Sequence, residues 1–263
     1  MLTEFLKLFF TGWVFAGLFM VVTFIVSRRI KNTGIVDVAW SIGFAPVAIF
    51  YATFSHGDLT RRWLIAGMAT LWSVRLAAHI AARVKHSHPK EDERYHKLRE
   101  EWGAQEAQKM FGFFQVQAAL LIVLSVPFLL ACMNARTGIS AFEMVGVAVW
   151  LIALGGESLS DHQLKQFKAD PKNKGHVCQA GLWHYSRHPN YFFEWLIWMG
   201  YFIFALGSPW GWITVYCPAL MLFFLLKVTG IPMTEELSVK NRGDEYRQYQ
   251  KTTSAFVPWF RKG

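Results

Sequence analysis

Charged residues are scarce in this sequence of 263 residues, because only 17% of them are Asp, Glu, Lys or Arg while 53% are hydrophobic. A soluble domain carries about 25% charged residues. The apolar content excludes intrinsic disorder, and an aromatic content of 16% is unlike a collagen or a coiled coil. The composition indicates an integral membrane protein whose main partner is the lipid bilayer.

Cysteine is also scarce, and several nucleotide-binding signatures are missing. Cys132, Cys178 and Cys217 are far apart and form no CxxC pair, which excludes a disulfide-stapled secreted module, and we expect buried thiols and no metal. Neither GxGxxG nor GxxxxGK[ST] occurs, so Rossmann and P-loop sites are excluded. Any nucleotide must be held in a different way.

Long apolar runs, in contrast, are plentiful. A helix needs about 20 mainly apolar residues to cross a bilayer. Seven candidate runs lie at residues 5–27, 36–54, 63–82, 113–133, 142–159, 191–206 and 210–232. They predict an all-α, polytopic membrane protein in which residues 1–263 form a single domain of seven transmembrane helices. The first run is too long for a signal peptide, so we expect it to remain in the protein.

The basic residues lie mainly on one side of these spans. Segments after the first, third and fifth spans, together with the C-terminal tail, hold 21 of the 27 lysines and arginines. This asymmetry predicts an outside N-terminus and a cytoplasmic C-terminus. Residues 83–112 would be a cytoplasmic loop with an amphipathic helix, and residues 233–263 a cytoplasmic tail. Topology thus explains the net charge of +9, and we expect no nucleic-acid partner.

Ionisable residues inside a span are costly and therefore mark candidate functional sites. Asp37 lies in the second span, and Trp72, Arg75 and His79 share one face of the third. A structural ion pair between Asp37 and Arg75 is an alternative interpretation of these two residues.

A larger polar group lies at the cytoplasmic ends of the later spans. Its spacing places pairs of side chains on common helix faces, which predicts a water-accessible cavity open to the cytoplasm. The group comprises Glu157, Asp161, Lys165, Lys168, Asn190, Glu194, Glu235 and Glu236. The lysines are equally well explained as positive-inside anchors.

The string HYSRHPNYFFEW at residues 184–195 is the most specific local pattern. Pro189 before an apolar run predicts the start of a helix. Arg187 and His188 would then lie at a helix N-terminus, which favours anions such as the phosphates of a cofactor.

Taken together, these motifs resemble the steroid 5α-reductase family, in particular its bacterial branch. The matching strings are VDVAW, WSVRL, EDERY, ESLSDHQLKQFK, GLWHYSRHPNYFFEW, the EE pair at 235–236 and EYRQYQKTTSAFVPWF. The resemblance implies a seven-span enzyme, with a cytoplasm-facing cofactor cavity, that reduces an activated C=C bond with NADPH. The expected substrate is a lipid-soluble enone such as a 3-oxo-Δ4-steroid. The expected form is a monomer in a bacterial inner membrane.

The resemblance also implies roles for individual residues. Family members hydrogen-bond the substrate ketone through a Glu in the second span and a Tyr in the third, and Asp37 and Trp72 stand near those positions. Tyr95 is the next candidate proton donor. Glu157 stands where an Asn is expected. The residues assigned to the cofactor are Arg75, Arg83, Arg94, Tyr95, Glu157, Asp161, Lys165, Lys168, Arg187, His188, Asn190, Tyr191, Glu194, Glu235, Glu236, Tyr246 and Tyr249.

Two other classes of protein remain as alternatives. Isoprenylcysteine and phospholipid methyltransferases, which use S-adenosylmethionine, share an RHPxY string, a later EE pair and a YxxY string. The SLSD stretch and Asn190 favour the reductase. A lipid-binding or transport protein would explain the apolar helices, but not the polar groups at one end.

Overall fold

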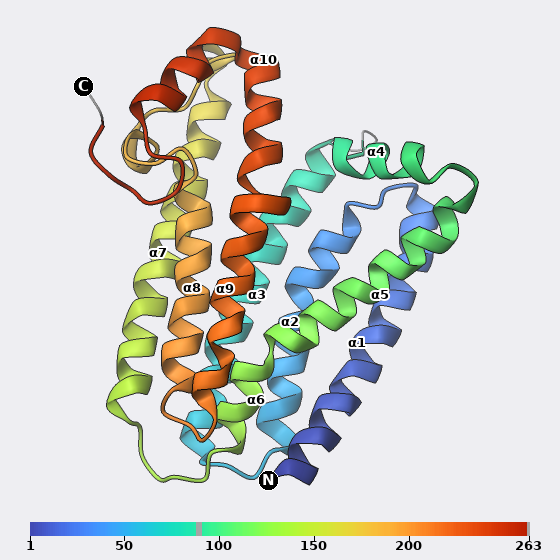
Figure 1. Ribbon diagram of the computed structural model, residues 1–263, viewed down its shortest axis with the longest axis vertical. Helices are drawn as coiled ribbons and strands as arrows, with labels where there is room; N and C mark the ends of the chain where they lie inside the picture. Colours follow the sequence, from blue (N-terminus) through green and yellow to red (C-terminus); the bar gives the residue numbers. More distant parts are fainter. Residues whose placement is uncertain (88–90, 262–263) are drawn as a thin grey trace. The chain divides into compact units, whose positions relative to one another are not determined.

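The computed structural model describes residues 1–87 and 91–261, and within these ranges the chain forms helices and no strand (Figure 1). An all-helical, polytopic membrane protein is thereby confirmed. The helices group into two compact units, Met1–Ile139 and Ser140–Gly263. The single domain of seven spans stays a prediction. Residues 88–90 of the predicted loop and 262–263 of the predicted tail lie outside the described residues.

The first unit is a bundle built mainly from apolar helices. Its elements are α1 (Leu2–Ile30), α2 (Ile35–Phe54), α3 (Leu59–Ser87), α4 (Glu93–Trp102), η1 (Gly103–Gln105), α5 (Glu106–Leu124) and α6 (Val126–Met133). α2 packs on α3, and α1 packs on α5. Phe44, Trp72, Phe114 and Phe128 are fully buried in its core. Tyr95 is buried on α4, while His96 and Lys97 are exposed, as an amphipathic helix requires.

The second unit is built around the long helix pair α7 and α8. Its elements are α7 (Ala141–Ala169), η2 (Pro171–Asn173), η3 (Gly181–His184), α8 (Pro189–Ala205), η4 (Gly211–Val215), α9 (Tyr216–Phe223), the π-helical turn η5 (Phe224–Val228) and α10 (Ile231–Thr252). Ser140 and Glu143 form a reciprocal capping box that fixes the start of α7. Pro189 stands at the first position of α8, as predicted.

Glycines let α7 and α8 approach each other closely. A Cβ atom added at Gly146 would lie 2.6 Å from the backbone nitrogen of Phe204, and one at Gly156 would lie 2.4 Å from the ring of Phe193. On the facing helix, a Cβ at Gly200 would lie 2.9 Å from the Cβ of Trp150. Small residues serve this purpose in membrane helix pairs, where close backbone contact replaces hydrophobic burial.

Most of the predicted spans coincide with observed helices. Within the described ranges, six helical stretches are long and apolar enough to cross a membrane. The predicted sixth span corresponds to α8, whose 17 residues extend over about 25 Å at 1.5 Å per residue. The predicted fourth span is two helices, because α5 and α6 are separated at Ser125. All three cysteines are free and buried, as expected.

The predicted orientation can be tested by labelling introduced cysteines. Arg136 and Lys172 are both exposed, and the native cysteines are buried. We expect a membrane-impermeant maleimide to label Arg136→Cys only from outside and Lys172→Cys only from the cytoplasmic side. Labelling of both positions from the same side would contradict the topology.

Candidate functional site

Arg187, between η3 and α8, belongs to a polar network in the second unit. Its Nε donates to Oε1 of Glu235 on α10 at 2.6 Å, and its Nη1 donates to the carbonyl of Gln250 at 2.9 Å and to that of Thr253. The side chains of Arg187 and Glu235 are only 10% and 16% exposed. An Arg held this way fixes the start of α8 against both ends of α10.

His188 also contacts the carboxylate of Glu235 through a ring nitrogen. Its Nε2 lies 3.2 Å from Oε1 of Glu235, and its ring stacks on Tyr191 at 5.4 Å between centroids. Burial lowers the pKa of His188 below its ordinary value, although the hydrogen bond and charge of Glu235 act in the opposite direction. Because a carboxylate oxygen accepts, the Nε2–H of His188 donates to Glu235.

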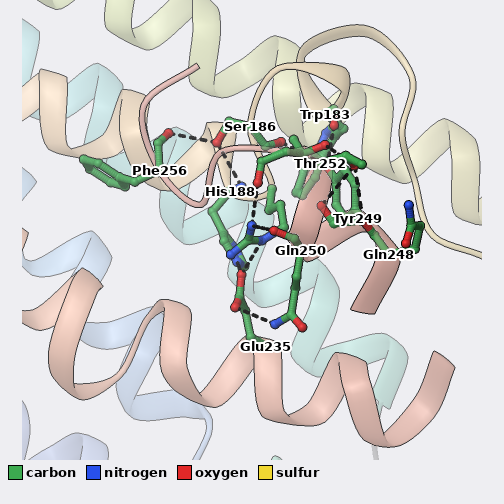
Figure 2. A network of polar contacts seen from close by, with 11 residues as sticks. Trp183, Ser186, His188, Glu235, Gln248, Tyr249, Gln250, Thr252 and Phe256 are labelled. Carbon is green, nitrogen blue, oxygen red and sulfur yellow. Dashed lines mark hydrogen bonds and ion pairs between the residues drawn. The ribbon is translucent and has the colours of Figure 1, made fainter. Parts of the chain in front are cut away.

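The remaining oxygen of Glu235 and the end of α10 complete this network. Oε2 of Glu235 accepts from Nε2 of Gln250 at 2.8 Å. The hydroxyl of Tyr249 donates to the carbonyls of Trp183 and Ser186, the latter at 3.1 Å (Figure 2). Every polar atom of the Glu235 carboxylate is thus used within the protein, so Glu235 organises the site.

A second polar contact joins α7 to α8. Nδ2 of Asn190 donates to Oδ1 of Asp161 at 3.3 Å, while its Oδ1 is buried without a hydrogen-bond partner among the described residues. Tyr191 follows on α8, and its hydroxyl lies 3.2 Å from Oγ1 of Thr234 on α10. The amide of Asn190 therefore keeps one acceptor that a ligand can use.

The other candidates of the second unit differ in exposure. Glu157 is buried on α7, whereas Lys165 and Lys168 are exposed on the same helix. Glu194 is half-buried on α8, and Glu236 is exposed on α10. Tyr246 is buried against Val177 and Tyr249.

In the first unit, Asp37 binds two residues of α4. Nη2 of Arg94 donates to Oδ2 of Asp37 at 2.8 Å, and the hydroxyl of Tyr95 donates to Oδ1 at 2.7 Å. Asp37 thus binds Arg94 and Tyr95. The sequence had suggested an ion pair with Arg75 as an alternative. Asp37 acts here as an acceptor, and Tyr95 holds the proton between them.

Asp92 positions the Arg94 side chain. It caps α4 by accepting from the backbone nitrogen of Arg94 at 3.0 Å, and it also accepts from Nε of that residue at 3.0 Å. Burial alone would raise the pKa of Asp92, but the hydrogen bonds and charge of Arg94 outweigh it and lower the pKa below its ordinary value.

The remaining candidates of the first unit lie on α3. Trp72 is fully buried with its ring 5.4 Å from that of Phe44, Arg75 is half-buried, and Arg83 is exposed. Among the described residues, no group of three His, Cys, Asp or Glu side chains could hold a metal ion.

Sequence reasoning missed several members of these networks. Gln250 lies inside the EYRQYQK string, and Thr234 directly precedes the EE pair, so proximity to these motifs was the available signal. Arg99 binds Glu91 and Glu106 at 3.0 and 2.9 Å, which extends the polar cluster around α4. In the sequence, the alternating charges of the EDERYHKLREEW run were the available signal for this polar cluster.

Comparison with known proteins places the chain in a family. Residues 23–253 match the family described as "Protein of unknown function (DUF1295)". The chain is 26% identical over 270 residues to "Uncharacterized protein C594.04c" of Schizosaccharomyces pombe, a match that covers 89% of this chain and 74% of that protein. No solved structure matches the chain. The protein belongs to the DUF1295 family, a membrane family related to the steroid 5α-reductases.

Proposed function

We propose that the protein uses NADPH to reduce the C=C bond of a lipid-soluble α,β-unsaturated ketone, with a 3-oxo-Δ4-steroid as the first candidate. The observation that carries this proposal is the set of polar contacts joining α7, α8 and α10 in the second unit. They are the pairs Asp161–Asn190, Tyr191–Thr234 and His188–Glu235. The relation of the family to the steroid 5α-reductases supports it.

The residues present fit a nicotinamide cofactor. The buried Oδ1 of Asn190 offers an acceptor to a carboxamide or ribose hydroxyl, since a buried polar atom gains from a donor. Lys165 and Lys168 are exposed on α7, where they can meet the 2′-phosphate that distinguishes NADPH from NADH. Arg187 contributes less to binding the cofactor phosphates than its position in the sequence suggested. Its Nε and Nη1 already bind Glu235 and two backbone carbonyls.

When bound, NADPH would supply the hydride. The protein's own task is to stabilise the negative charge that develops on the ketone oxygen, for which preorganised donors are the most effective device. Asp37 accepts from two donors, whereas Tyr95 carries the hydroxyl proton between them at 2.7 Å. Tyr95 can deliver that proton to the ketone once its hydroxyl turns from Asp37 toward the substrate. Trp72 can offer only an indole N–H, which donates a hydrogen bond but no proton.

Methyl transfer from S-adenosylmethionine is the second candidate function. One observation favours it: the Arg187–Glu235 ion pair joins the RHPNY string to the EE pair. These are two of the motifs that the sequence shares with isoprenylcysteine and phospholipid methyltransferases.

Direct binding measurements distinguish the two reactions. We expect the purified protein in detergent to bind NADPH more tightly than NADH, and to bind S-adenosylmethionine weakly or not at all. Calorimetry or fluorescence titration with the three ligands would show this. Tight binding of S-adenosylmethionine alone would replace the reductase proposal with the methyltransferase.

Removing the Asn190 amide tests the cofactor assignment. We expect Asn190→Ala to weaken NADPH binding by about 1–3 kcal/mol, the usual cost of leaving a buried partner unpaired, and Glu194→Ala to act similarly. Asn241→Ala on the exposed side of α10 is the matched control and should bind normally. Normal NADPH binding by both Asn190→Ala and Glu194→Ala would contradict the assignment of the cofactor to α8.

A further inference from the structure

The 253–261 segment follows α10 and lies along the 183–188 loop. The backbone nitrogen of Arg187 donates to the carbonyl of Ser254 at 2.8 Å, and that of Trp259 donates to the carbonyl of Tyr185 at 2.9 Å. The hydroxyl of Ser186 donates to the carbonyl of Phe256 at 2.8 Å (Figure 2). These three hydrogen bonds, together with the one from Nη1 of Arg187 to the carbonyl of Thr253, hold the segment against the residues that precede α8.

The same segment lies where the apolar helices begin and end. The ring of Phe256 packs on those of Phe192 and Trp195 in the first turns of α8, at 5.6 and 5.9 Å between centroids. Trp183, in the neighbouring loop, donates from Nε1 to the carbonyl of Ser160 on α7 at 3.0 Å. Because α8 starts its apolar stretch here and α7 ends its own, the segment lies at the level where a membrane surface would meet these two helices.

Large apolar side chains of the segment are exposed at this level. Val257, Trp259 and Phe260 are 49%, 68% and 75% exposed. Tyr185 is also exposed, and its ring lies edge-on to that of Phe260 at 6.3 Å. An exposed apolar cluster of this kind marks an interaction surface, and Trp and Tyr are enriched where a membrane meets water.

The charged residues in the segment and directly before it are all basic. Residues 251–261 include Lys251 and Arg261, and they contain no Asp or Glu. Basic side chains beside interfacial aromatics are attracted to anionic lipid headgroups. Aromatic exposure, basic charge and contact with the start of α8 therefore favour lipid over a protein partner.

We propose that the 253–261 segment is an interfacial anchor, whose Trp259 and Phe260 side chains insert among the lipid headgroups at this end of the second unit. Ser186 and Arg187, which bind the segment, directly precede His188. The anchor therefore holds the polar network of α8 and α10 at the membrane surface, whichever reaction that network serves.

Fluorescence quenching in vesicles tests the anchor. The full chain carrying Val257→Cys, labelled with an environment-sensitive dye, would be reconstituted in phosphatidylcholine with or without phosphatidylglycerol. We expect strong quenching by lipids spin-labelled near the headgroup and weak quenching by aqueous iodide, with greater protection from iodide when phosphatidylglycerol is present. Lys172→Cys, on the exposed turn η2, is the aqueous control and should show the reverse pattern.

A second variant separates insertion from mere proximity to the membrane. Adding Trp259→Ser and Phe260→Ser to the Val257→Cys reporter should lower lipid quenching at least twofold and raise iodide quenching. Two results would overturn the anchor: a Val257→Cys label as open to iodide as the Lys172→Cys label, or a label shielded from both quenchers. The second result would mean that protein, including a second copy of this chain, covers the segment.

Discussion

Replacing Glu235 with alanine should lower the free energy of unfolding by about 3–5 kcal/mol, the range expected when one partner of a buried ion pair is removed. The substitution leaves Arg187 and His188 facing a vacant position, although their side chains are only 10% and 4% exposed. It also removes the acceptor of Gln250. Thermal or denaturant unfolding in detergent, compared with wild type, measures the loss.

Glu236→Ala is the matched control for this experiment. It removes the same side chain one residue further along α10, but from an exposed position, where substitutions usually change stability by within about 0.5 kcal/mol. Equal stability of the Glu235→Ala and Glu236→Ala variants would show that the network does not hold α8 against α10.

Tyr95→Phe should reduce turnover of an enone by about 10²- to 10⁴-fold, the usual contribution of a positioned proton donor. The variant keeps the ring and loses only the hydroxyl that donates to Asp37 at 2.7 Å. Because the cofactor residues assigned to α7 and α8 are unchanged, NADPH binding should be retained. Single-turnover rates and titrations on the same preparation separate the two effects.

Four further variants identify the donor. Tyr185→Phe, at an exposed tyrosine, should turn over normally. Asp37→Asn should be less damaging than Asp37→Ala, because an amide oxygen can still accept from Tyr95. If Tyr95→Phe turns over at the wild-type rate while Trp72→Phe does not, the indole of Trp72 is the group that polarises the ketone.

The helices were largely predictable, because length and hydropathy decide whether a segment can cross a membrane. The interruption near Ser125 was missed within a continuous apolar run, although Pro127 in the first turn of α6 was the available signal. The π-helical turn at Phe224–Val228 was equally hidden within an apolar run. The division into two units has no mark in composition, because the helices of both units are alike.

The candidate site was predictable only where its residues share a helix face or a motif. Asn190 and Asp161 meet as their motifs suggested, and Arg187 and His188 share Glu235. The residues that bind Asp37 could not be read from the sequence, because Arg94 and Tyr95 lie 57 and 58 residues further along the chain. Arg187 donates two of its hydrogen bonds to backbone carbonyls, and such contacts have no signature in the sequence.

The glycines between α7 and α8 set the spacing of side chains that they never touch. The Asn190–Asp161 hydrogen bond is already 3.3 Å long, near the limit of such bonds. A methyl group at Gly156 would meet the ring of Phe193 at 2.4 Å, so the ring or the helix pair would have to shift to admit it. Gly156 lies five residues before Asp161, and Phe193 lies three residues after Asn190. Any such shift would therefore reach the polar pair directly, so the tolerance of the site is decided by the absence of a side chain at this glycine.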